Sequence, residues 1–262
     1  MKTKDVAKFI VDWLRSYLEQ TKLDGFVVGV SGGVDSALTS TLCAMTGKPT
    51  LCLEMPIYQE SNQVNRAKNH TSWLSKTYKN VRVKVVPLTA LYDSFCQLDA
   101  TSSAFEDTVL SLANTRSRLR MTTLYYFASK QGLLVAGTGN KVEDFGVGFY
   151  TKYGDGGVDI SPIADLMKSQ VRELASHLGV NRTIIDAAPT DGLWDDDRTD
   201  EDQLGATYDE LEWAMEQHEM GKKPADFSGH KKHIFTTYMN HHTANKHKMI
   251  PVPICVIPQH LM

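Results

Sequence analysis

The apolar residues at the start of the chain recur at spacings of three and four, which is the period of one helix face. This pattern predicts an amphipathic helix that runs to about Gln20. After it comes a short β-branched run at residues 25–30, then a turn of serine and glycine residues. A segment rich in Ala, Leu and Thr follows from Ser36 to about Met45. We therefore expect a strand, a glycine loop and a helix in that order. The apolar positions of the first helix are Val6, Phe9, Ile10, Trp13, Leu14, Tyr17 and Leu18.

Short apolar runs then alternate with helical stretches through the first half of the chain. Strands are predicted at residues 50–56, 81–88 and 132–138. A helix is predicted at about 61–78, and a long helical stretch ends at Lys130. Because helices that connect parallel strands produce this alternation, the pattern predicts an α/β fold with a doubly wound parallel sheet of about five strands.

The alternation stops after the fourth predicted strand. Residues 139–161 are rich in glycine, aspartate and aromatic residues, and a loop of that length inside a compact domain is usually functional. Further helices are predicted at about 166–178 and 203–220. The last forty residues are rich in His and Lys and lead into a proline-interrupted tail at 251–258, which is not expected in the middle of a sheet. Without an internal repeat or a low-complexity linker, residues 1–262 are expected to form a single domain.

Composition and charge narrow the class of protein. The 262 residues are 42% hydrophobic and 23% charged, which suits one large globular domain. A net charge of -3 gives no basic surplus that would favour nucleic acid or an acidic membrane. The four cysteines form no CxxC pair, so reduced thiols in the core are expected. No apolar run approaches the roughly 20 residues of a membrane span, and charges interrupt the N-terminus, so a cytoplasmic location is predicted.

The segment GVSGGVDS, residues 29–36, carries the strongest local chemical signal. Glycines at a strand-to-helix turn let backbone N–H groups approach an anion, and the following helix directs its positive end to the same place. The segment therefore predicts a phosphate site, although it matches neither GxxxxGK[ST] nor GxGxxG. Asp35 would repel phosphates unless a divalent cation lay between them, which indicates a magnesium ligand. A tight turn with Asp35 at a helix N-terminus is the structural alternative.

The SGGxDS pattern resembles the pyrophosphate-binding loop of the N-type ATP pyrophosphatases, which include NAD, GMP and asparagine synthetases and tRNA-modifying enzymes. Residues 137–175, from GTGNKVED to QVRELA, resemble the NAD synthetase family, as do NTRSRLRM at 114–121 and downstream LW, DE, LG, Tyr and HK elements. The resemblance covers nearly the whole chain. It implies an adenine nucleotide α-hydrolase-like fold and a homodimer.

The resemblance also assigns roles to individual residues. It implies that Asp35 and Glu143 bind Mg²⁺ and that they and Lys168 are the catalytic residues. The implied contacts to nicotinic acid adenine dinucleotide (deamido-NAD) are Arg118, Lys152, Asp159, His247 and Lys248. The implied ATP contacts are Gly29, Val30, Ser31, Gly32, Gly33, Val34, Asp35, Ser36, Thr138, Lys168 and Thr190.

Simple structural readings of some of these residues remain open. Arg118 and Arg120 point in different directions on a helix, so one can face a ligand while the other has a structural role. Alternatively, both side chains are charges exposed to solvent. Lys152 and Asp159 could instead pair with each other.

The chain departs from the family pattern at three places. Ser117 replaces the usual alanine, residues 145–149 hold about one residue more than common members, and the usual HKR reads His247, Lys248 and Met249. Only the first two positions of that last motif therefore transfer.

The implied activity is that of a carbon–nitrogen ligase in the final step of NAD biosynthesis. ATP would activate deamido-NAD as an NAD-adenylate, and ammonia would then give NAD and AMP, with pyrophosphate released in the first step. Because the glycine loop begins at Gly29, no N-terminal glutaminase domain is expected. Three alternatives stay open: another adenylating amidotransferase or thiolation enzyme, a non-catalytic nucleotide sensor, and a zinc site among the C-terminal histidines.

Overall fold

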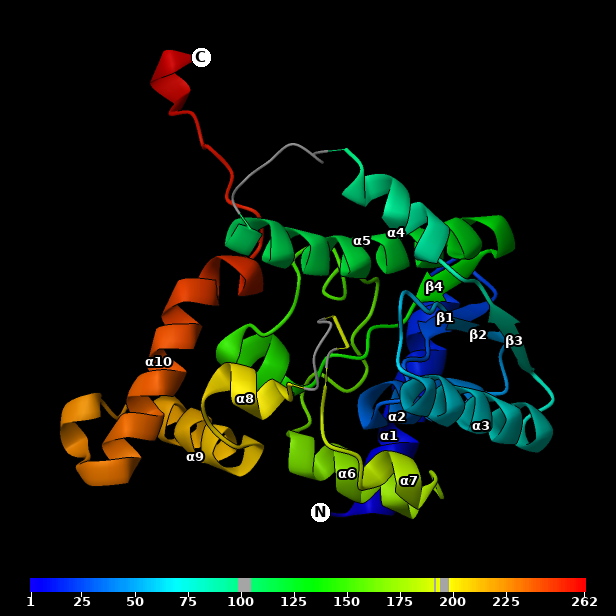
Figure 1. The fold of residues 1–262 in the computed structure, drawn as a ribbon, viewed down its shortest axis with the longest axis horizontal. Coiled ribbons are helices and arrows are strands. Elements are labelled where there is room, and N and C mark those ends of the chain that lie inside the picture. Colours follow the sequence, from blue (N-terminus) through cyan, green and yellow to red (C-terminus); the bar gives the residue numbers. More distant parts are fainter. Residues whose placement is uncertain (99–104, 191, 194–197) are drawn as a thin grey trace.

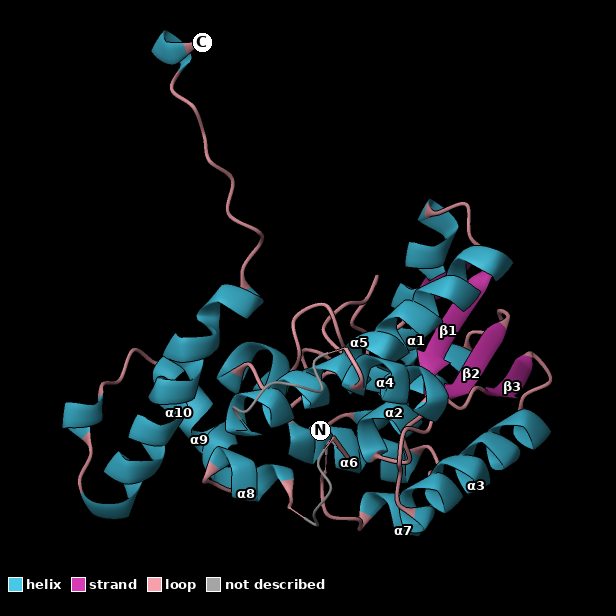
Figure 2. Ribbon diagram, turned by 45° about the horizontal axis from the view of Figure 1, so that its top comes forward, coloured by secondary structure: helices cyan, strands magenta, loops and turns pink. Residues whose placement is uncertain are grey.

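A parallel sheet of four strands lies at the centre of the molecule, in the order β3-β2-β1-β4. The computed structural model describes residues 1–98, 105–190, 192–193 and 198–262. Each of the four strand positions predicted individually is confirmed. The strands are β1 (Gly25–Gly29), β2 (Thr50–Glu54), β3 (Val81–Val85) and β4 (Leu133–Val135), and Figure 2 shows β1, β2 and β3 side by side.

The sheet has four strands within the described residues rather than about five. Val27 pairs in register with Leu51 on one side and with Val135 on the other. Beyond β4, a single parallel bridge joins Ala136 to Ile160. Gly156 and Gly157 precede this bridge and Pro162 follows it. Glycine weakens strand formation and proline lacks the N–H that a ladder needs, so pairing does not extend into a fifth strand.

Helices cover both faces of the sheet, which confirms the doubly wound arrangement (Figure 1). Phe26 and Val28 of β1 pack into a core shared with α1, α2 and α6. Val27, which points the other way, belongs to a core shared with α4 and α5. The first face is covered by α1 (Thr3–Gln20), α2 (Val34–Met45), α3 (Ser61–Thr77) and α6 (Lys168–His177), and the second by α4 (Thr89–Cys96) and α5 (Phe105–Gln131).

The predicted apolar stripe of the first helix is divided between the core and the surface. Leu14 and Leu18 are buried in the core, whereas Phe9 is 72% exposed and Trp13 is 38% exposed. Only part of the stripe is therefore used inside one subunit.

Several elements in the second half of the chain differ from the prediction. The helix expected at 203–220 is interrupted, because Gly205 adopts a left-handed conformation with φ 70° and ends α8 (Asp200–Leu204). Thr207 then caps α9 (Tyr208–Glu219). The His and Lys-rich segment forms α10 (Gly229–Met249), which the sequence analysis did not identify as a helix. The remaining short elements are η1 (Val142–Val147), α7 (Arg182–Ile185), η2 (Pro224–Asp226) and η3 (Gln259–Leu261).

The expected loop at 139–161 contains one turn of π-helix, η1. A π-helical turn holds more residues than an α-helical turn, and such turns are frequent at functional sites. The extra residue noted near 145–149 thus falls where the chain forms a wide turn. With α9 and α10, η1 builds a second apolar cluster at the end of the molecule away from the sheet (Figure 1).

The tail after α10 extends away from the rest of the molecule (Figures 1 and 2). All of its residues from Ile250 onward are exposed. Cys255 lies on this tail and is exposed, so the expectation of core cysteines holds for Cys43 and Cys52 but is wrong for Cys255. No helix among the described residues is long and apolar enough to cross a membrane.

A buried histidine connects the helix that follows the glycine loop to its neighbour α3. His70 is 1% exposed, and its Nε2 lies 2.9 Å from Ser40 Oγ of α2. Ser40 Oγ donates to the carbonyl of Ser36 at 2.7 Å, so the histidine Nε2–H is the donor to Ser40. Burial lowers the pKa of His70 to about 4.

Folding stability should therefore fall as the pH drops from about 6.5 to about 4. In this window the unfolded chain binds a proton at His70 that the folded chain does not, which costs up to about 3 kcal/mol. We expect His70→Gln to lose this part of the pH dependence when urea unfolding is followed by circular dichroism between pH 4 and 7. His177→Gln, at an exposed position on α6, is the control, and identical profiles for all three proteins would contradict the assignment.

Candidate active site

The glycine loop joins the end of β1 to the start of α2. Gly32 has φ +90°, and a Cβ there would lie 2.6 Å from the carbonyl oxygen of Gln63, so both the conformation and the space require glycine. The Gly33 N–H donates to Ser31 Oγ at 3.2 Å, and the Ser31 N–H donates to Ser36 Oγ at 3.2 Å. Because α2 begins immediately after the loop, the positive end of its dipole lies at this place.

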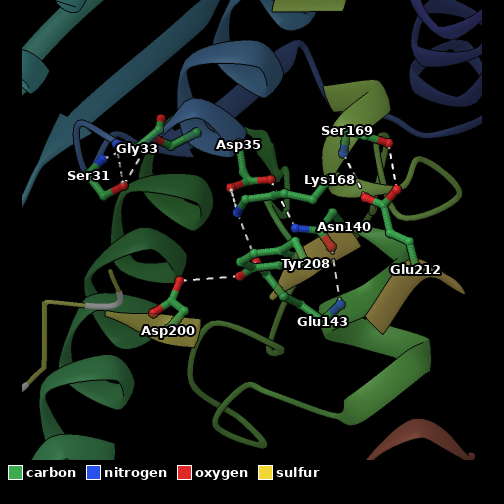
Figure 3. Close-up of polar contacts among 11 residues, drawn as sticks. Ser31, Gly33, Asp35, Asn140, Glu143, Lys168, Ser169, Asp200, Tyr208 and Glu212 are labelled. Atoms are coloured by element: carbon green, nitrogen blue, oxygen red, sulfur yellow. Dashed lines mark hydrogen bonds and ion pairs between the residues drawn. The ribbon is translucent and has the colours of Figure 1, made fainter. Parts of the chain in front are cut away.

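The ammonium group of Lys168 lies between two carboxylates that come from distant parts of the sequence (Figure 3). Its Nζ is 2.6 Å from Asp35 Oδ2 and 2.9 Å from Glu143 Oε1. The lysine side chain is 3% exposed. Burial alone would lower the pKa of Lys168, but the two carboxylates outweigh it and raise the pKa above its ordinary value. Lys168 is therefore a charged ammonium that holds α6, α2 and η1 together.

Asn140 connects the same two acidic residues through its amide. Its Nδ2 donates to Asp35 Oδ1 at 3.1 Å, and its Oδ1 accepts from the Glu143 N–H at 3.1 Å. The residue is fully buried. One amide thus fixes the carboxylate of Asp35 and the start of the π-helical turn that carries Glu143.

Two side chains of α9 contact the elements of this centre: Tyr208 contacts Glu143 and Lys168, and Glu212 contacts Ser169, the neighbour of Lys168 (Figure 3). The Tyr208 hydroxyl donates to Glu143 Oε1 at 2.5 Å and lies 3.3 Å from Asp200 Oδ2, and the Lys168 Nζ lies 4.7 Å from the centre of the tyrosine ring. Burial, Glu143 and Asp200 raise the pKa of Tyr208, so its hydroxyl keeps its proton. Glu212 accepts from the N–H of Ser169 at 2.8 Å and from its Oγ at 2.6 Å.

A cavity of about 290 Å³ unites the glycine loop with this centre. Its lining includes Asp35, Glu143 and Lys168, and also Asp144, Asp155 and Asp200. Burial, followed by repulsion from Glu143, Asp155 and Asp35, raises the pKa of Asp144 to about 8. Asp144 is therefore protonated at neutral pH, and the negative charge at the centre is carried by its neighbours.

The residues present fit a magnesium ion. Asp35 and Glu143 already share one cation, the Lys168 ammonium, and carboxylate oxygens are hard ligands. Within the described ranges, no three or more His, Cys, Asp or Glu side chains form a ready-made metal site. Mg²⁺ is commonly held by one or two carboxylates with water and substrate phosphates, so two carboxylates beside a phosphate loop suit it.

The remaining predicted ATP contacts lie around the same cavity. Thr138 and Thr190 line it, together with the loop residues Gly29, Val30, Ser31, Gly33, Val34, Asp35 and Ser36. Thr190 Oγ1 accepts from the Gly192 N–H at 3.3 Å. Trp194 and the acidic residues Asp195 to Asp197 of the predicted downstream elements lie outside the described residues.

Four of the predicted deamido-NAD contacts form a cationic group beside the cavity. The guanidinium of exposed Arg118 lies 3.4 Å from the Lys152 carbonyl oxygen, and Lys152 Nζ donates to the carbonyl of His247 at 3.1 Å. Lys248 Nζ donates to the carbonyl of Tyr150 at 2.8 Å, and Tyr150 lines the cavity. Burial lowers the pKa of Lys248, opposed by Asp155.

Asp159 does not belong to this cationic group, because its hydrogen bonds are made to other residues. It accepts from the Tyr125 hydroxyl at 2.9 Å and from the Val135 N–H at 2.8 Å, so it does not pair with Lys152. Arg120 donates to the Met55 carbonyl at 3.1 Å and to Gln59 Oε1 at 2.8 Å, which ties α5 to the segment after β2. Arg118 and Arg120 do point in different directions.

The histidines of α10 bind to separate partners. His230 Nε2 lies 2.6 Å from Glu210, His241 Nε2 lies 3.1 Å from the Leu204 carbonyl, and His242 Nδ1 lies 2.7 Å from the Gly146 carbonyl. These contacts fasten α10 to α9, α8 and η1. The geometry therefore gives each of these three histidines its own structural partner.

Sequence reasoning assigned no role to Asn140, Tyr208 or Glu212, although Asn140 and Tyr208 belong to the segments that resemble the family. Asn140 lies in the long functional loop, two residues after Thr138, and a buried amide between acidic residues gives no pattern along the chain. Tyr208 and Glu212 are four residues apart and so share a face of α9, but an isolated tyrosine and glutamate on a helix resemble ordinary amphipathic positions.

Comparisons with known proteins match nearly the whole chain. A family model described as NAD synthase matches residues 6–251. An NH(3)-dependent NAD(+) synthetase of Carboxydothermus hydrogenoformans is 37% identical over 233 residues, which are 86% of this chain and 93% of the relative. One from Archaeoglobus fulgidus is 35% identical over 256 residues, or 96% and 97% of the two chains. The structure of NMN synthetase from Francisella tularensis has a TM-score of 0.83 and 30% identity, and the match covers 99% of each chain.

Replacing the buried lysine should destabilise the fold. Lys168→Met leaves two carboxylates without their shared cation, and removing one partner of a buried ion pair costs about 3–5 kcal/mol. Lys141→Met is the matched control, because Lys141 pairs with the half-exposed Glu219 at 3.0 Å and such a pair contributes about 1 kcal/mol or less. Equal unfolding free energies of the two variants in urea titrations would show that Lys168 is not the central ion pair.

Proposed function

The chain belongs to the NAD synthase family, and from this premise we propose that it is an ammonia-dependent NAD synthetase. It would convert deamido-NAD, ATP and ammonia into NAD, AMP and pyrophosphate, and so form a carbon–nitrogen bond in the final step of NAD biosynthesis. The observation that carries the proposal is the Lys168 ammonium between Asp35 and Glu143, inside the cavity lined by the glycine loop.

The reaction has two steps. The nicotinate carboxylate of deamido-NAD attacks the α-phosphorus of ATP, which forms the NAD-adenylate and releases pyrophosphate. Ammonia then attacks the acyl carbon, loses a proton and displaces AMP, which gives the amide. Neither step requires a covalent bond to the protein, so the chain contributes positioning and electrostatic stabilisation.

The chain's own groups stabilise the charge that builds up on the phosphates. Because α2 begins in the glycine loop, its first N–H groups and its dipole would face the polyphosphate. Lys168 is charged and lines the same cavity, so its ammonium would add positive charge beside the phosphates while Asp35 and Glu143 hold it in place. Asp35 and Glu143 would hold Mg²⁺, which when bound supplies Lewis-acid neutralisation of phosphate charge.

The cationic group beside the cavity would bind the dinucleotide. Arg118, Lys152 and Lys248 are suited to phosphate and carboxylate groups, and His247 lies next to them on α10. The Lys248 contact with the carbonyl of Tyr150 connects this group to the ATP cavity. Asp159 accepts hydrogen bonds from Tyr125 and Val135 and lies outside this group, so a contact of Asp159 with the substrate would be separate from it.

Ammonia is the proposed nitrogen source because the curated relatives described above are named as NH(3)-dependent enzymes. The same relatives favour an NAD synthetase over a thiolation enzyme and over a nucleotide sensor. We place the reaction in the cytoplasm, where its nucleotide substrates are found.

A second candidate function is formation of NMN from nicotinic acid mononucleotide by the same chemistry. It is favoured by the similarity, over 99% of each chain, to the protein named NMN synthetase. The two functions share the ATP cavity and differ in whether the AMP half of the substrate is required.

Purified protein supplied with ATP, Mg²⁺ and ammonium should form NAD from deamido-NAD and release pyrophosphate. Asp35→Ala or Glu143→Ala should lower turnover by at least about 10²-fold, because each removes a group that holds charge at the phosphates. Asp165→Ala, at a fully exposed carboxylate, should match the unmodified protein. Chromatographic quantification of NAD and pyrophosphate makes the measurement.

Two further arms separate the alternatives. A higher kcat/KM for nicotinic acid mononucleotide than for deamido-NAD would replace the first function by the second. Glutamine as the sole nitrogen source should give no product. Absence of pyrophosphate release with either substrate would reject both functions.

We further propose that the protein is a homodimer. Ile254 is 84% exposed and Val256 is 83% exposed on the tail, and Phe9 is 72% exposed on α1, so apolar surface is available for a second copy. Light scattering after size exclusion should give twice the chain mass of 29.2 kDa, and Ile254→Asp with Val256→Asp should shift the population toward monomer. A monomeric unmodified protein would contradict the proposal.

A further inference from the structure

The hydroxyl of Tyr208 contacts the centre from an element that none of the predicted site residues occupies. It donates to Glu143 Oε1, the same oxygen that accepts from Lys168, at 2.5 Å and 2.9 Å respectively. The ring lies 4.7 Å from the Lys168 Nζ. Tyr208 is 1% exposed, so solvent does not compete for its hydroxyl. One side chain thus contacts both the carboxylate and the ammonium.

The next turn of the same helix fixes the backbone that carries Lys168. Glu212 receives two hydrogen bonds from Ser169, one from its N–H and one from its Oγ. These bonds lie at the first turn of α6, where backbone N–H groups lack partners within the helix. Residues 208 and 212 are four apart and so lie on one face of α9, from which Tyr208 points to Lys168 and Glu143, and Glu212 points to Ser169 (Figure 3).

The other end of α9 is held by the second apolar cluster. Leu211, Ala214 and Met215 are buried against α10 and η1. The hydroxyl of Tyr208 and the carboxylate of Glu212 therefore project from a helix that cannot shift without disturbing that cluster. This arrangement differs from a chance surface contact, because Tyr208 acts on η1, which carries Glu143, and Glu212 acts on the first turn of α6, which carries Lys168.

We propose that Tyr208, supported by Glu212, is a positioning residue that sets the distance between Glu143 and Lys168 for the activation of ATP. The inference rests on the proposed function. Neither residue touches a reacting atom: Tyr208 acts through Glu143, and Glu212 acts through Ser169. Groups that orient metal ligands in this way typically change activity by about 10- to 100-fold when they are removed.

Tyr208→Phe tests the proposal because it removes only the hydroxyl and keeps the ring beside Lys168. We expect kcat for amidation to fall about 10-fold or more, while KM for the nicotinate substrate stays within about threefold, since the cationic group is not changed. Tyr238→Phe is the matched control: Tyr238 is also 1% exposed and lies in the same apolar cluster. It should leave kcat unchanged. Glu212→Ala should lower kcat, whereas Glu216→Ala, at an exposed position one turn later, should not.

A second measurement does not depend on activity. In urea unfolding, Tyr208→Phe and Glu143→Ala remove the same hydrogen bond, so the midpoint of the double variant should fall by less than the sum of the single shifts. Tyr238→Phe combined with Glu143→Ala should be additive. Additive shifts for Tyr208, or an active protein in which Tyr208→Phe has the unmodified kcat, would overturn the positioning role. An inactive unmodified protein would reject the proposed function alone, and the unfolding cycle would then decide the role of Tyr208.

Discussion

The burial of one lysine between two carboxylates is the constraint on which the rest of the site depends. Lys168 is almost inaccessible to solvent, and its charge is balanced only because Asp35 and Glu143 lie on either side of it. These residues come from α6, α2 and η1. The ion pairs therefore set how the phosphate loop, the π-helical turn and the helix that carries the lysine lie relative to one another, and Asn140 and Tyr208 supply hydrogen bonds that keep the carboxylates in place.

The same constraint explains why the site suits polyphosphate and a divalent cation together. A phosphate loop beside a carboxylate is unfavourable by itself, since like charges repel. In the proposed function, the start of α2, the ammonium of Lys168 and a cation held by Asp35 and Glu143 would remove that conflict. The cationic group on α5, α10 and the loop at 150–153 lies beside this cavity and would give a separate surface for the second substrate in the proposed function.

Prediction from sequence succeeded where structure is local. The four strands and the helices between them are predicted by the spacing of apolar residues along the chain. The glycine loop is predicted by the glycines that its turn requires. Prediction failed at Gly205, where one glycine in a left-handed conformation interrupts the helical spacing of apolar residues and divides one expected helix into α8 and α9. It also failed for α10, because its apolar side chains are few and Ile234, Phe235 and Tyr238 are buried only by packing against α9 and η1.

The sequence by itself determined the fold class and the position of the glycine loop between the first strand and its helix, and through family resemblance it named the residues that we propose for the site. Those properties depend on spacing along the chain, which a single sequence contains. Only the tertiary structure decided that Lys168 lies between Asp35 and Glu143, that Asn140 and Tyr208 hold these carboxylates, and that Asp159 is engaged by Tyr125 and Val135. Contacts between residues far apart in the chain are set by how helices pack on the sheet, and no local pattern records them.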